Sequence, residues 1–388
     1  MKRLRIGVIY GGRSGEHEIS VASAAAVVSN LDRDRYEAVP LYIDRDGRLT
    51  IADRPPVAAS AADVIGRARV EGNRPAGRGG REAYLVPYPT LENLIAIDRD
   101  RVSGVEMGHD QATITGLSLD VVFPVLHGPY GEDGTIQGLL ELANVPYVGA
   151  GVLASSVGMD KAVMKVLFTA RGLPSVDYVV ARSSDWAADP RPVRQAVATR
   201  LKYPVFVKPV NLGSSVGISK VKTEAELDPA MALAAQFDRR VIIEAAVPNT
   251  REIECSVLGN DRPQASVPGE ILPSREFYDY DAKYLDESEV RVPAALPPAQ
   301  SEEVRRLATE AFLAIEGSGM ARVDFLLDDK SGRLYVNEIN TIPGFTTISM
   351  FPKLWMATGL SYSALLDRLI ELALERHAAK QQLRTSLT

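Results

Sequence analysis

The sequence predicts an α/β protein of two or three domains, with α+β organisation in its C-terminal part. The chain opens with an apolar strand at Leu4–Tyr10, a glycine-rich loop and a helical stretch at Glu16–Leu31, which is the start of an α/β unit. Near the C-terminus, two β-type runs flank the turn-forming residues 328–332 and predict an antiparallel hairpin. The length of 388 residues exceeds what one hydrophobic core usually fills.

Composition and charge narrow the function classes. The net charge of −6 gives no basic excess of the kind that binds nucleic acid or acidic membranes. No uncharged apolar run approaches the ~20 residues that span a bilayer, and the start of the chain lacks the pattern of a signal peptide. Cys255 is the only cysteine and the four histidines are scattered, which excludes an intrachain disulfide and disfavours a zinc site. We therefore expect a cytoplasmic protein.

The first part of the chain predicts strands that lead to a ligand-binding loop. Tyr36–Ile43 has the pattern of a second strand, and residues 53–116 predict a surface excursion with a few short strands. Leu119–Leu126 is a further buried-type strand that ends in the loop HGPYGEDG, which leads into a helix. Because α/β proteins bind ligands at the carboxyl ends of strands, His127 in this loop either contacts a substrate or hydrogen-bonds the loop.

Glu16 marks the beginning of the first helix. The glycine loop before it does not match the dinucleotide pattern G-x-G-x-x-G, and no P-loop lysine follows it. Glu16 is either an acid that binds a ligand or a first-turn acid that the helix dipole favours.

A strand lysine beside a Gly/Ser-rich loop marks the central part of the chain. Lys208 interrupts the apolar strand Tyr203–Pro209, and the loop Asn211–Ser219 follows. Such loops hold phosphates with backbone N–H groups and hydroxyls, and the lysine adds a point charge. Glu244 lies near the end of the strand Arg240–Val247, where it either accepts a hydrogen bond from an adenine amino group or ends the strand at solvent.

The remaining elements follow from apolar periodicity. In chain order they are a helix with Lys161 and Lys165, a strand at Val176–Ala181, a linker or insertion at Ser183–Pro192, strands at Glu252–Leu258 and Gln264–Ile271, a helix at Ser301–Ile315 and a last helix at Ala364–His377. The segment Phe277–Tyr284 has few apolar anchors and predicts a loop of the kind that closes over ligands.

The C-terminal hairpin carries the residues that point most clearly to chemistry. Side chains alternate along a strand, so each strand of the hairpin presents one polar set. The predicted faces are Arg322, Asp324 and Leu326 on the first strand, and Leu334, Val336, Glu338 and Asn340 on the return strand. If the register places both sets on one side, the four polar residues meet at one end of the hairpin.

This cluster predicts a metal site. Asp324, Glu338 and Asn340 supply hard oxygen ligands, which suit Mg²⁺ held jointly with substrate phosphates. Arg322 beside them can stabilise charge on a transferring phosphoryl group or an oxyanion. The alternative is a surface hairpin with solvated charges. Because the strands are otherwise apolar and buried acids need partners or a metal, we favour the metal site.

Together these motifs resemble the ATP-grasp superfamily and, within it, the D-alanine–D-alanine ligases. In chain order they are IGVIYGGRSGEHEIS, HGPYGEDG, MDKAVMK, VFVKPVNLGSSVGIS, REIECSVLGN, FYDYDAKY, ARVDFLL and NEINTIPGFTTISM. The resemblance implies three domains with ATP between two antiparallel sheets: an N-terminal α/β domain at 1–150, a central domain at 151–247 and a C-terminal domain at 248–388. It implies an enzyme that phosphorylates one D-alanine with ATP and couples it to a second, which supplies peptidoglycan precursors.

The resemblance also assigns roles by motif position. For substrates it implies Glu16 on the ammonium of the first D-alanine, His127 on the same substrate, Lys283 near the phosphate or the second carboxylate, and Ser349 on the second carboxylate. For ATP it implies Lys161, Lys208, Ser215, Glu244, Val247 and Glu252. Asp324, Glu338 and Asn340 match the ligands of two Mg²⁺ ions, with Mn²⁺ as an alternative. Arg322 and the Gly344 N–H match an oxyanion site, and Glu16, Ser214 and Tyr284 match a hydrogen-bonded trio that anchors the mobile loop.

Two positions refine this expectation. Some relatives carry a lysine directly after the adenine-contacting glutamate, where this chain has Ala245, so that extra nucleotide contact is not expected. Relatives that make the D-alanyl-D-lactate depsipeptide often differ at the position of Tyr284, so this tyrosine favours the dipeptide.

Two other hypotheses fit parts of the sequence. Another ATP-grasp ligase, such as a D-alanine–D-lactate or lysine-biosynthetic relative, would share the metal hairpin and lack the set Glu16, Ser214 and Tyr284. A nucleotide-binding regulator would have lost Arg322 or a metal ligand, and all are present. The expected partners are small molecules, with no nucleic acid and no membrane, and the family suggests a homodimer.

Overall fold

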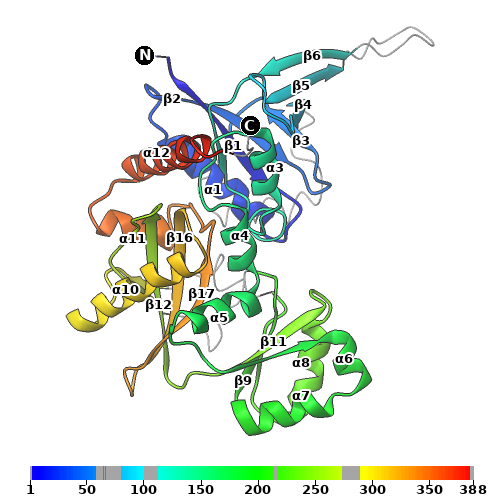
Figure 1. The fold of residues 1–388 in the computed structure, drawn as a ribbon, viewed down its shortest axis with the longest axis vertical. Helices are drawn as coiled ribbons and strands as arrows, with labels where there is room; N and C mark the ends of the chain where they lie inside the picture. The colour runs from blue at the N-terminus through cyan, green and yellow to red at the C-terminus, as the bar shows by residue number, and fades with distance from the viewer. Residues whose placement is uncertain are drawn as a thin grey trace. The chain divides into compact units, whose positions relative to one another are not determined.

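The computed structural model describes residues 2–57, 64, 66, 80–99, 112–213, 216–272 and 289–384. These residues form two compact units (Figure 1). Unit 1 is drawn from residues 1–149, 344–349 and 361–388, and unit 2 from residues 150–343 and 350–360.

Unit 1 is built on a seven-stranded mixed sheet with the order β6-β5-β4-β3-β2-β1-β7. Its strands are β1 (Leu4–Gly11), β2 (Tyr36–Ile43), β3 (Leu49–Ala52), β4 (Gly80–Leu85), β5 (Leu94–Arg99), β6 (Ala112–Leu117) and β7 (Val121–Pro124). Strand β1 pairs in parallel with β2 and β7, and the pairs from β2 to β6 are antiparallel. Parallel strands are covered on both faces, which explains the apolar run in β1. The short strands predicted between residues 53 and 116 are observed as β4, β5 and β6. The predicted surface excursion is wrong for them, because they extend the main sheet and Leu94 and Ala96 of β5 are buried in its core.

The helices of unit 1 are α1 (His17–Asn30), α3 (Thr135–Ala143) and α12 (Tyr362–Gln381). Helix α12, at the red end of the chain in Figure 1, contacts α1 and β7. Leu365, Leu366 and Leu369 are fully buried along its apolar stripe, as the periodicity of the last helix predicts. The C-terminal helix thus completes a core whose strands come from the first third of the chain.

The first half of unit 2 contains a four-stranded antiparallel sheet with the order β10-β9-β11-β8. The strands of this sheet are β8 (Tyr178–Arg182), β9 (Val205–Pro209), β10 (Ser219–Val221) and β11 (Arg240–Ala245). The helices of this half are α4 (Val152–Met159), α5 (Lys161–Ala170), α6 (Ser183–Ala188), α7 (Arg191–Ala196) and α8 (Leu227–Ala234). Two short helical turns, η1 (Val197–Leu201) and η2 (Glu224–Glu226), complete it. Of the two alternatives at Ser183–Pro192, a linker or an insertion, the linker is wrong, because α6 and the start of α7 occupy the segment. Each of these helices has six residues, too short for apolar periodicity to reveal it, and the Arg194 guanidinium over the Trp186 ring joins the two.

The second half of unit 2 contains a six-stranded antiparallel sheet, in which β15-β14-β12-β16-β17 form the path and β13 pairs with β12. Its elements are β12 (Thr250–Gly259), β13 (Gln264–Ala265), β14 (Gly269–Leu272), β15 (Glu289–Arg291), α10 (Pro298–Ala314), β16 (Gly319–Asp328), β17 (Leu334–Asn340) and α11 (Met350–Ala357). The α/β prediction and the antiparallel C-terminal sheet are confirmed.

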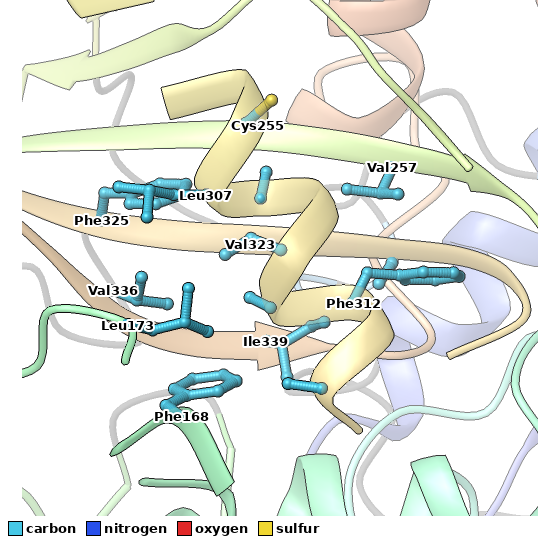
Figure 2. Close-up of a cluster of buried hydrophobic side chains, with 14 of the residues drawn as sticks. Phe168, Leu173, Cys255, Val257, Leu307, Phe312, Val323, Phe325, Val336 and Ile339 are labelled. Atoms are coloured by element: carbon cyan, nitrogen blue, oxygen red, sulfur yellow. The ribbon is translucent and has the colours of Figure 1, made fainter. Parts of the chain in front are cut away.

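Helix α10 covers one face of this sheet. Figure 2 shows Leu307 and Phe312 of α10 packed against Val323 and other apolar side chains of the strands, with Phe168 of α5 beside them. Because side chains alternate along β12 and β16, the residues between these core positions face the opposite side of the sheet. That opposite side carries the charged residues described below.

In the part of the chain that the structure describes, no helix is both long enough and apolar enough to cross a membrane.

Candidate active site

Unit 2 contains a cavity of about 440 Å³ between its two antiparallel sheets. On β9 and β11, Val207 and Ile243 belong to the core under α8, so the alternate residues Lys208 and Glu244 line the cavity. The six-stranded sheet contributes the other wall through residues of β12, β16 and β17. This volume lies in the range of small-molecule sites.

Glu244 forms a buried charge cluster with two lysines. Its Oε2 lies 2.6 Å from Nζ of Lys208, and its Oε1 lies 3.0 Å from Nζ of Lys165. Burial by itself would raise the pKa of the Glu244 carboxyl, but Lys165 and Lys208 outweigh burial and lower the pKa to about 2. Glu244 is only 2% exposed, so the alternative in which it ends its strand at solvent is wrong.

The two lysines of this cluster differ in their environment. Burial lowers the pKa of Lys165, and the attraction of Glu244 offsets only part of that effect. Burial acts in the same direction on Lys208, but Glu244 and Glu338 raise its pKa above the ordinary value. Lys208, which also lines the cavity, is therefore held as a cation where an anionic ligand can reach it.

Lys161 connects the central loop to the hairpin. It is the first residue of α5, and its Nζ donates a hydrogen bond of 2.8 Å to the carbonyl of Leu212 in the loop after β9. The same Nζ lies 3.4 Å from Oε2 of Glu338 on β17. Lys161 of α5 and Lys208 of β9 thus line the same cavity, where both cations can attract an anionic ligand.

Strands β16 and β17 bring together the four polar residues of the predicted metal hairpin. Arg322 pairs with Asn340, and Asp324 pairs with Glu338. Asn340 Nδ2 donates a hydrogen bond of 3.0 Å to Oδ2 of Asp324. The predicted meeting of these side chains at one end of the hairpin is confirmed.

The predicted face of the return strand is partly wrong because of a β-bulge. Glu338 pairs with Asp324 but Val336 pairs with Phe325, so Asn337 is an extra residue on β17. The extra residue reverses the alternation, and Leu334 and Val336 lie in the core under α10 instead of beside Glu338. Because of the bulge, the same short strand places Leu334 and Val336 in the apolar core and Glu338 at the cavity.

Arg322 is the positive centre of this group. Its guanidinium makes two hydrogen bonds to Asp324, of 2.6 Å and 2.7 Å, and its Nε lies 3.0 Å from Oε2 of Glu254 on β12. Burial alone would lower the pKa of Arg322, but Asp324 and Glu254 raise it well above its ordinary value. The guanidinium is therefore a fixed positive charge, 7% exposed, at the cavity wall.

The donor set fits a divalent metal ion only if a substrate shares it. Asp324 and Glu338 offer carboxylates and Asn340 offers an amide oxygen. Among the described residues there is no group of three or more His, Cys, Asp or Glu side chains that could hold a metal. Mg²⁺ commonly takes one or two carboxylates and completes its shell with phosphate oxygens and water, so these residues fit that ion beside a nucleotide.

Unit 1 contains a second group of predicted site residues around the start of α1. Glu16 directly precedes α1, is 9% exposed and makes no capping hydrogen bond to the helix. Its Oε2 lies against Gly128, where a Cβ atom would come within 2.8 Å of it. Gly128 has a φ of +72°, so glycine satisfies both the turn and the close approach of the carboxylate.

Ser23 links His127 to the segment before α11. The Nε2 atom of His127 lies 3.3 Å from Oγ of Ser23 on α1, and the Phe345 N–H donates to the same Oγ at 3.2 Å. His127 is 5% exposed and reaches α1 through its side chain, while its carbonyl accepts a hydrogen bond of 2.6 Å from Ser14. Ser23 therefore fixes the positions of two predicted substrate loops relative to α1.

Gly344 and Ser349 belong to the same short segment of unit 1. Ser349 Oγ lies 2.7 Å from Oγ1 of Thr346 and accepts a hydrogen bond of 3.1 Å from the Thr346 N–H. A Cβ atom at Gly344 would come within 2.8 Å of Ser349 Oγ, so this position accommodates only glycine without a shift of the serine. Phe345 packs edge-on against Phe123 at 5.7 Å between ring centroids, which anchors the segment.

The structure gathers the predicted residues into two sets. Lys161, Lys208, Glu244, Val247, Glu252, Arg322, Asp324 and Glu338 line the cavity of unit 2. Asn340 is outside this lining and belongs to the same set through its hydrogen bond to Asp324. Glu16, His127, Gly344 and Ser349 belong to unit 1. The predicted roles of Ser214, Ser215, Lys283 and Tyr284 fall on residues outside the described part of the chain.

The sequence did not predict the participation of three further residues in these two sets, namely Lys165, Glu254 and Ser23. Lys165 follows Lys161 by four residues, a spacing that places both lysines on one face of a helix. Glu254 follows Glu252 by two residues and so shares its strand face. No pattern in the sequence distinguishes Ser23 from its neighbours.

Two family models match the chain. The model described as D-ala D-ala ligase N-terminus matches residues 5–150, and the model described as D-ala D-ala ligase C-terminus matches residues 167–371. Among similar proteins, the D-alanine–D-alanine ligase of Heliobacterium modesticaldum is 49% identical over 383 residues, with 98% of each chain covered. That of Solibacter usitatus is 47% identical over 381 residues, again with 98% of each chain covered.

Solved structures give the same result. The D-alanine–D-alanine ligase from Coxiella burnetii has a TM-score of 0.79 and 38% identity, covering 98% of this chain and 97% of its own. The VanG D-Ala:D-Ser ligase from Enterococcus faecalis has a TM-score of 0.79 and 33% identity, covering 96% of this chain and 100% of its own.

Proposed function

The chain belongs to the D-alanine–D-alanine ligase family, and we propose that it uses ATP to join two D-alanines into D-alanyl-D-alanine. The observation that carries this proposal is the cavity of unit 2, where two lysines face the pair Asp324 and Glu338 with Arg322 beside them. Such a cavity offers cations for phosphates and oxygen ligands for the metal that accompanies them.

The nucleotide would occupy the cavity between the two antiparallel sheets. We assign Lys161 and Lys208 to the phosphates, because both present Nζ to the cavity from different elements. Glu244, Val247 and Glu252 line the same cavity and are assigned to the nucleoside. Since Lys165 and Lys208 hold the Glu244 carboxylate ionised, it can only accept a hydrogen bond, which suits an adenine amino group.

Asp324, Glu338 and Asn340 are assigned to Mg²⁺, shared with the phosphates of ATP. The bound ion would neutralise charge on the phosphates as the γ-phosphoryl group moves. Two ions are the family expectation, and Mn²⁺ is the practical substitute. Arg322 hydrogen-bonds both oxygens of Asp324, so the guanidinium would also orient this proposed metal ligand.

The reaction proceeds in two chemical steps. First, a carboxylate oxygen of one D-alanine attacks the γ-phosphorus of ATP, the bond to the β-phosphate oxygen breaks, and ADP leaves. Second, the amine of another D-alanine attacks the acyl carbon, the amine loses a proton, and inorganic phosphate leaves from the tetrahedral intermediate. We assign Arg322 to the negative charge that develops on the acyl phosphate and the intermediate, where a fixed cation lowers the barrier.

Substrate selection is assigned to unit 1. Glu16 provides a carboxylate for the ammonium of the first D-alanine, and His127 lies in the loop whose Gly128 touches that carboxylate. Gly344 and Ser349 keep their predicted roles toward the oxyanion and the second carboxylate. Lys283 and Tyr284 keep theirs as well.

The proposed cellular location follows from the substrates. ATP is a cytoplasmic metabolite, so we propose a cytoplasmic enzyme that supplies the dipeptide for peptidoglycan precursors. The homodimer and the three-domain division at residues 150 and 247 also stay proposals that rest on the family.

The test is Mg²⁺-dependent release of phosphate from ATP with identification of products by mass. The reactions to compare contain D-alanine, L-alanine, D-alanine with D-lactate, and D-alanine with D-serine. Phosphate release with D-alanine alone, together with the dipeptide, supports the proposal. Release only when D-lactate or D-serine is also present would support the ATP site and change the proposed second substrate. D-serine is included because the chain is similar to a D-Ala:D-Ser ligase. Binding of ATP without phosphate release in any of these reactions would favour the alternative hypothesis of a nucleotide-binding regulator without catalytic activity.

A further inference from the structure

Lys165 is a buried cation that the proposed reaction does not use. It is 0% exposed and does not line the cavity, so no substrate can touch it. A buried ammonium is costly unless partners compensate for the lost water. A lysine in this place therefore needs a reason other than ligand binding.

The Nζ atom of Lys165 contacts three separate parts of unit 2. It lies 3.0 Å from Oε1 of Glu244 on β11, and it donates hydrogen bonds of 3.4 Å to Oγ of Ser175 and 3.3 Å to the carbonyl of Asn337. Ser175 lies in the segment between α5 and β8, and Asn337 is the bulged residue of β17. One ammonium thus bridges the nucleotide-facing sheet and the metal hairpin.

The contact with Asn337 is the informative one. The bulge gives Asn337 no partner position in the ladder with β16, and Lys165 supplies a donor for its carbonyl. The bulge is also what turns Leu334 and Val336 into the core while Glu338 faces the cavity. A group that holds the bulge therefore determines where the next residue, Glu338, points.

Lys165 does more than compensate the charge of Glu244. Lys208 also pairs with that carboxylate, at 2.6 Å, so Lys165 is not its sole cationic partner among the described residues. An apolar side chain of similar shape would avoid the cost of burying the ammonium. What Lys165 adds is a charge 3.0 Å from Oε1 of Glu244 together with directed N–H donors to Ser175 and to the carbonyl of Asn337.

We infer that Lys165 is a positioning residue, which holds the Asn337 bulge and the Glu244 carboxylate so that Glu338 and Asn340 are aligned for a metal ion shared with the nucleotide. The inference rests on the proposed function, because it concerns the same nucleotide and metal site. Lys165 acts through Asn337 and Glu244 and touches no predicted metal ligand itself.

The test measures metal binding without turnover. Mn²⁺ is titrated into the full-length protein in the presence of ADP and without D-alanine, and free Mn²⁺ is followed by electron paramagnetic resonance. Lys165→Met keeps the apolar stem and removes the donors; we expect its Mn²⁺ affinity to fall ~10–100-fold, the range for partners that orient metal ligands. Leu173→Ala is the matched control, because Leu173 is buried in the same core as Phe168 of α5 and contacts neither Glu244 nor Asn337 through a hydrogen bond. It should lower thermal stability and leave Mn²⁺ affinity as in the wild type.

The outcomes separate this inference from the proposed function. If the wild type binds Mn²⁺ with ADP and Lys165→Met binds it equally well, Lys165 does not position the site. Equal losses in Lys165→Met and Leu173→Ala would likewise overturn the inference, since they would reflect stability alone. A wild type that binds neither Mn²⁺ nor ADP would instead overturn the proposed function, and the inference with it.

A second variant keeps the test decisive if Lys165→Met does not fold. Lys165→Gln removes the charge and retains a shorter donor that can still approach the carbonyl of Asn337. We expect its affinity to lie between those of the wild type and Lys165→Met, or, if the Met variant is lost, well below the wild type. Wild-type affinity in a folded Lys165→Gln protein would overturn the inference.

Discussion

Arg322 holds both carboxylate oxygens of Asp324, two residues further along strand β16, at 2.6 Å and 2.7 Å. The same carboxylate accepts a hydrogen bond of 3.0 Å from Asn340. Glu254 on β12 lies 3.0 Å from the Arg322 Nε, so the guanidinium is held from two neighbouring strands. The proposed metal ligand Asp324 and the cation assigned to the transferring phosphoryl group are therefore partners in one ion pair. Each can be substituted separately to test the two assignments.

Asp324→Asn should abolish most turnover in a protein that still folds, with a loss of stability because the buried Arg322 loses a charged partner while Glu254 remains. The amide preserves the shape of the side chain but removes the charge that both a metal and Arg322 require. We expect kcat to fall by ~10²-fold or more, the size of effect seen when one electrostatic contact to a transition state is removed. Phosphate release and thermal unfolding measured on the same preparation give the two quantities. Asp329→Asn, in the exposed turn of the same hairpin, is the control and should be near normal. Near-normal kcat in Asp324→Asn would contradict the assignment of a metal site to this hairpin.

Arg322→Ala should lower kcat rather than raise KM. Its charge is assigned to the acyl phosphate and the tetrahedral intermediate, so its loss should cost ~10²–10³ in kcat. Steady-state kinetics with ATP and D-alanine varied separately measures this. Arg306→Ala removes an exposed arginine that pairs with Glu310 on α10, and it controls for the change in net charge. A change confined to KM would show that Arg322 binds substrate and transition state equally, against the assigned role.

The hairpin illustrates what alternation along a strand can and cannot predict. The polar residues were expected to meet because Arg322 and Asp324 are two apart, and so are Glu338 and Asn340; the observed register agrees. The bulge at Asn337 was not predicted, because a single extra residue leaves no mark in a seven-residue strand. Its carbonyl is satisfied by Lys165, which lies 172 residues earlier in the chain. Local pattern cannot encode such a contact.

The same limit applies to Glu244 and to the C-terminal helix. An acid at the end of an apolar strand is compatible with solvent or with a buried partner, and only the tertiary fold brings Lys165 of α5 within 3.0 Å of it. The apolar stripe of α12 predicts that the helix is buried but not that its core belongs to unit 1. In each case the deciding partner is distant in sequence.

Ser23→Ala should weaken the use of D-alanine more than the use of ATP. Ser23 Oγ lies 3.3 Å from His127 Nε2 and accepts a hydrogen bond from the Phe345 N–H, so its removal frees two substrate loops of unit 1. We expect KM for D-alanine to rise, KM for ATP to stay constant, and stability to fall by about 1 kcal/mol for the lost hydrogen bond between Ser23 and the Phe345 N–H. Ser29→Ala is the control, because the Ser29 hydroxyl donates to the Ala25 carbonyl within the same helix. Equal effects of the two substitutions on KM would contradict a role of Ser23 in substrate binding.

Stability in acid should depend on Glu244. Its pKa is lowered from 4.5 to about 2 because Lys165 and Lys208 outweigh the effect of burial. A carboxyl with a lowered pKa in the folded state contributes stability that is fully present above the unfolded pKa, near 4.5, and is lost as the pH falls toward 2. The lowering corresponds to about 3 kcal/mol of unfolding free energy at neutral pH.

Comparison with Glu244→Gln isolates this contribution from that of other acids. Urea unfolding of both proteins between pH 7 and pH 2.5 should show the variant well below the wild type at neutral pH, because two buried lysines have lost their carboxylate. The gap should narrow as the pH falls below about 4.5, since protonation removes the same charge from the wild type. Glu224→Gln is the control, because that side chain is 61% exposed and should leave the curve unchanged. A gap of constant size across this pH range would mean that the Glu244 carboxylate is not held ionised by its lysines, and its assignment as an acceptor toward adenine would fail with it.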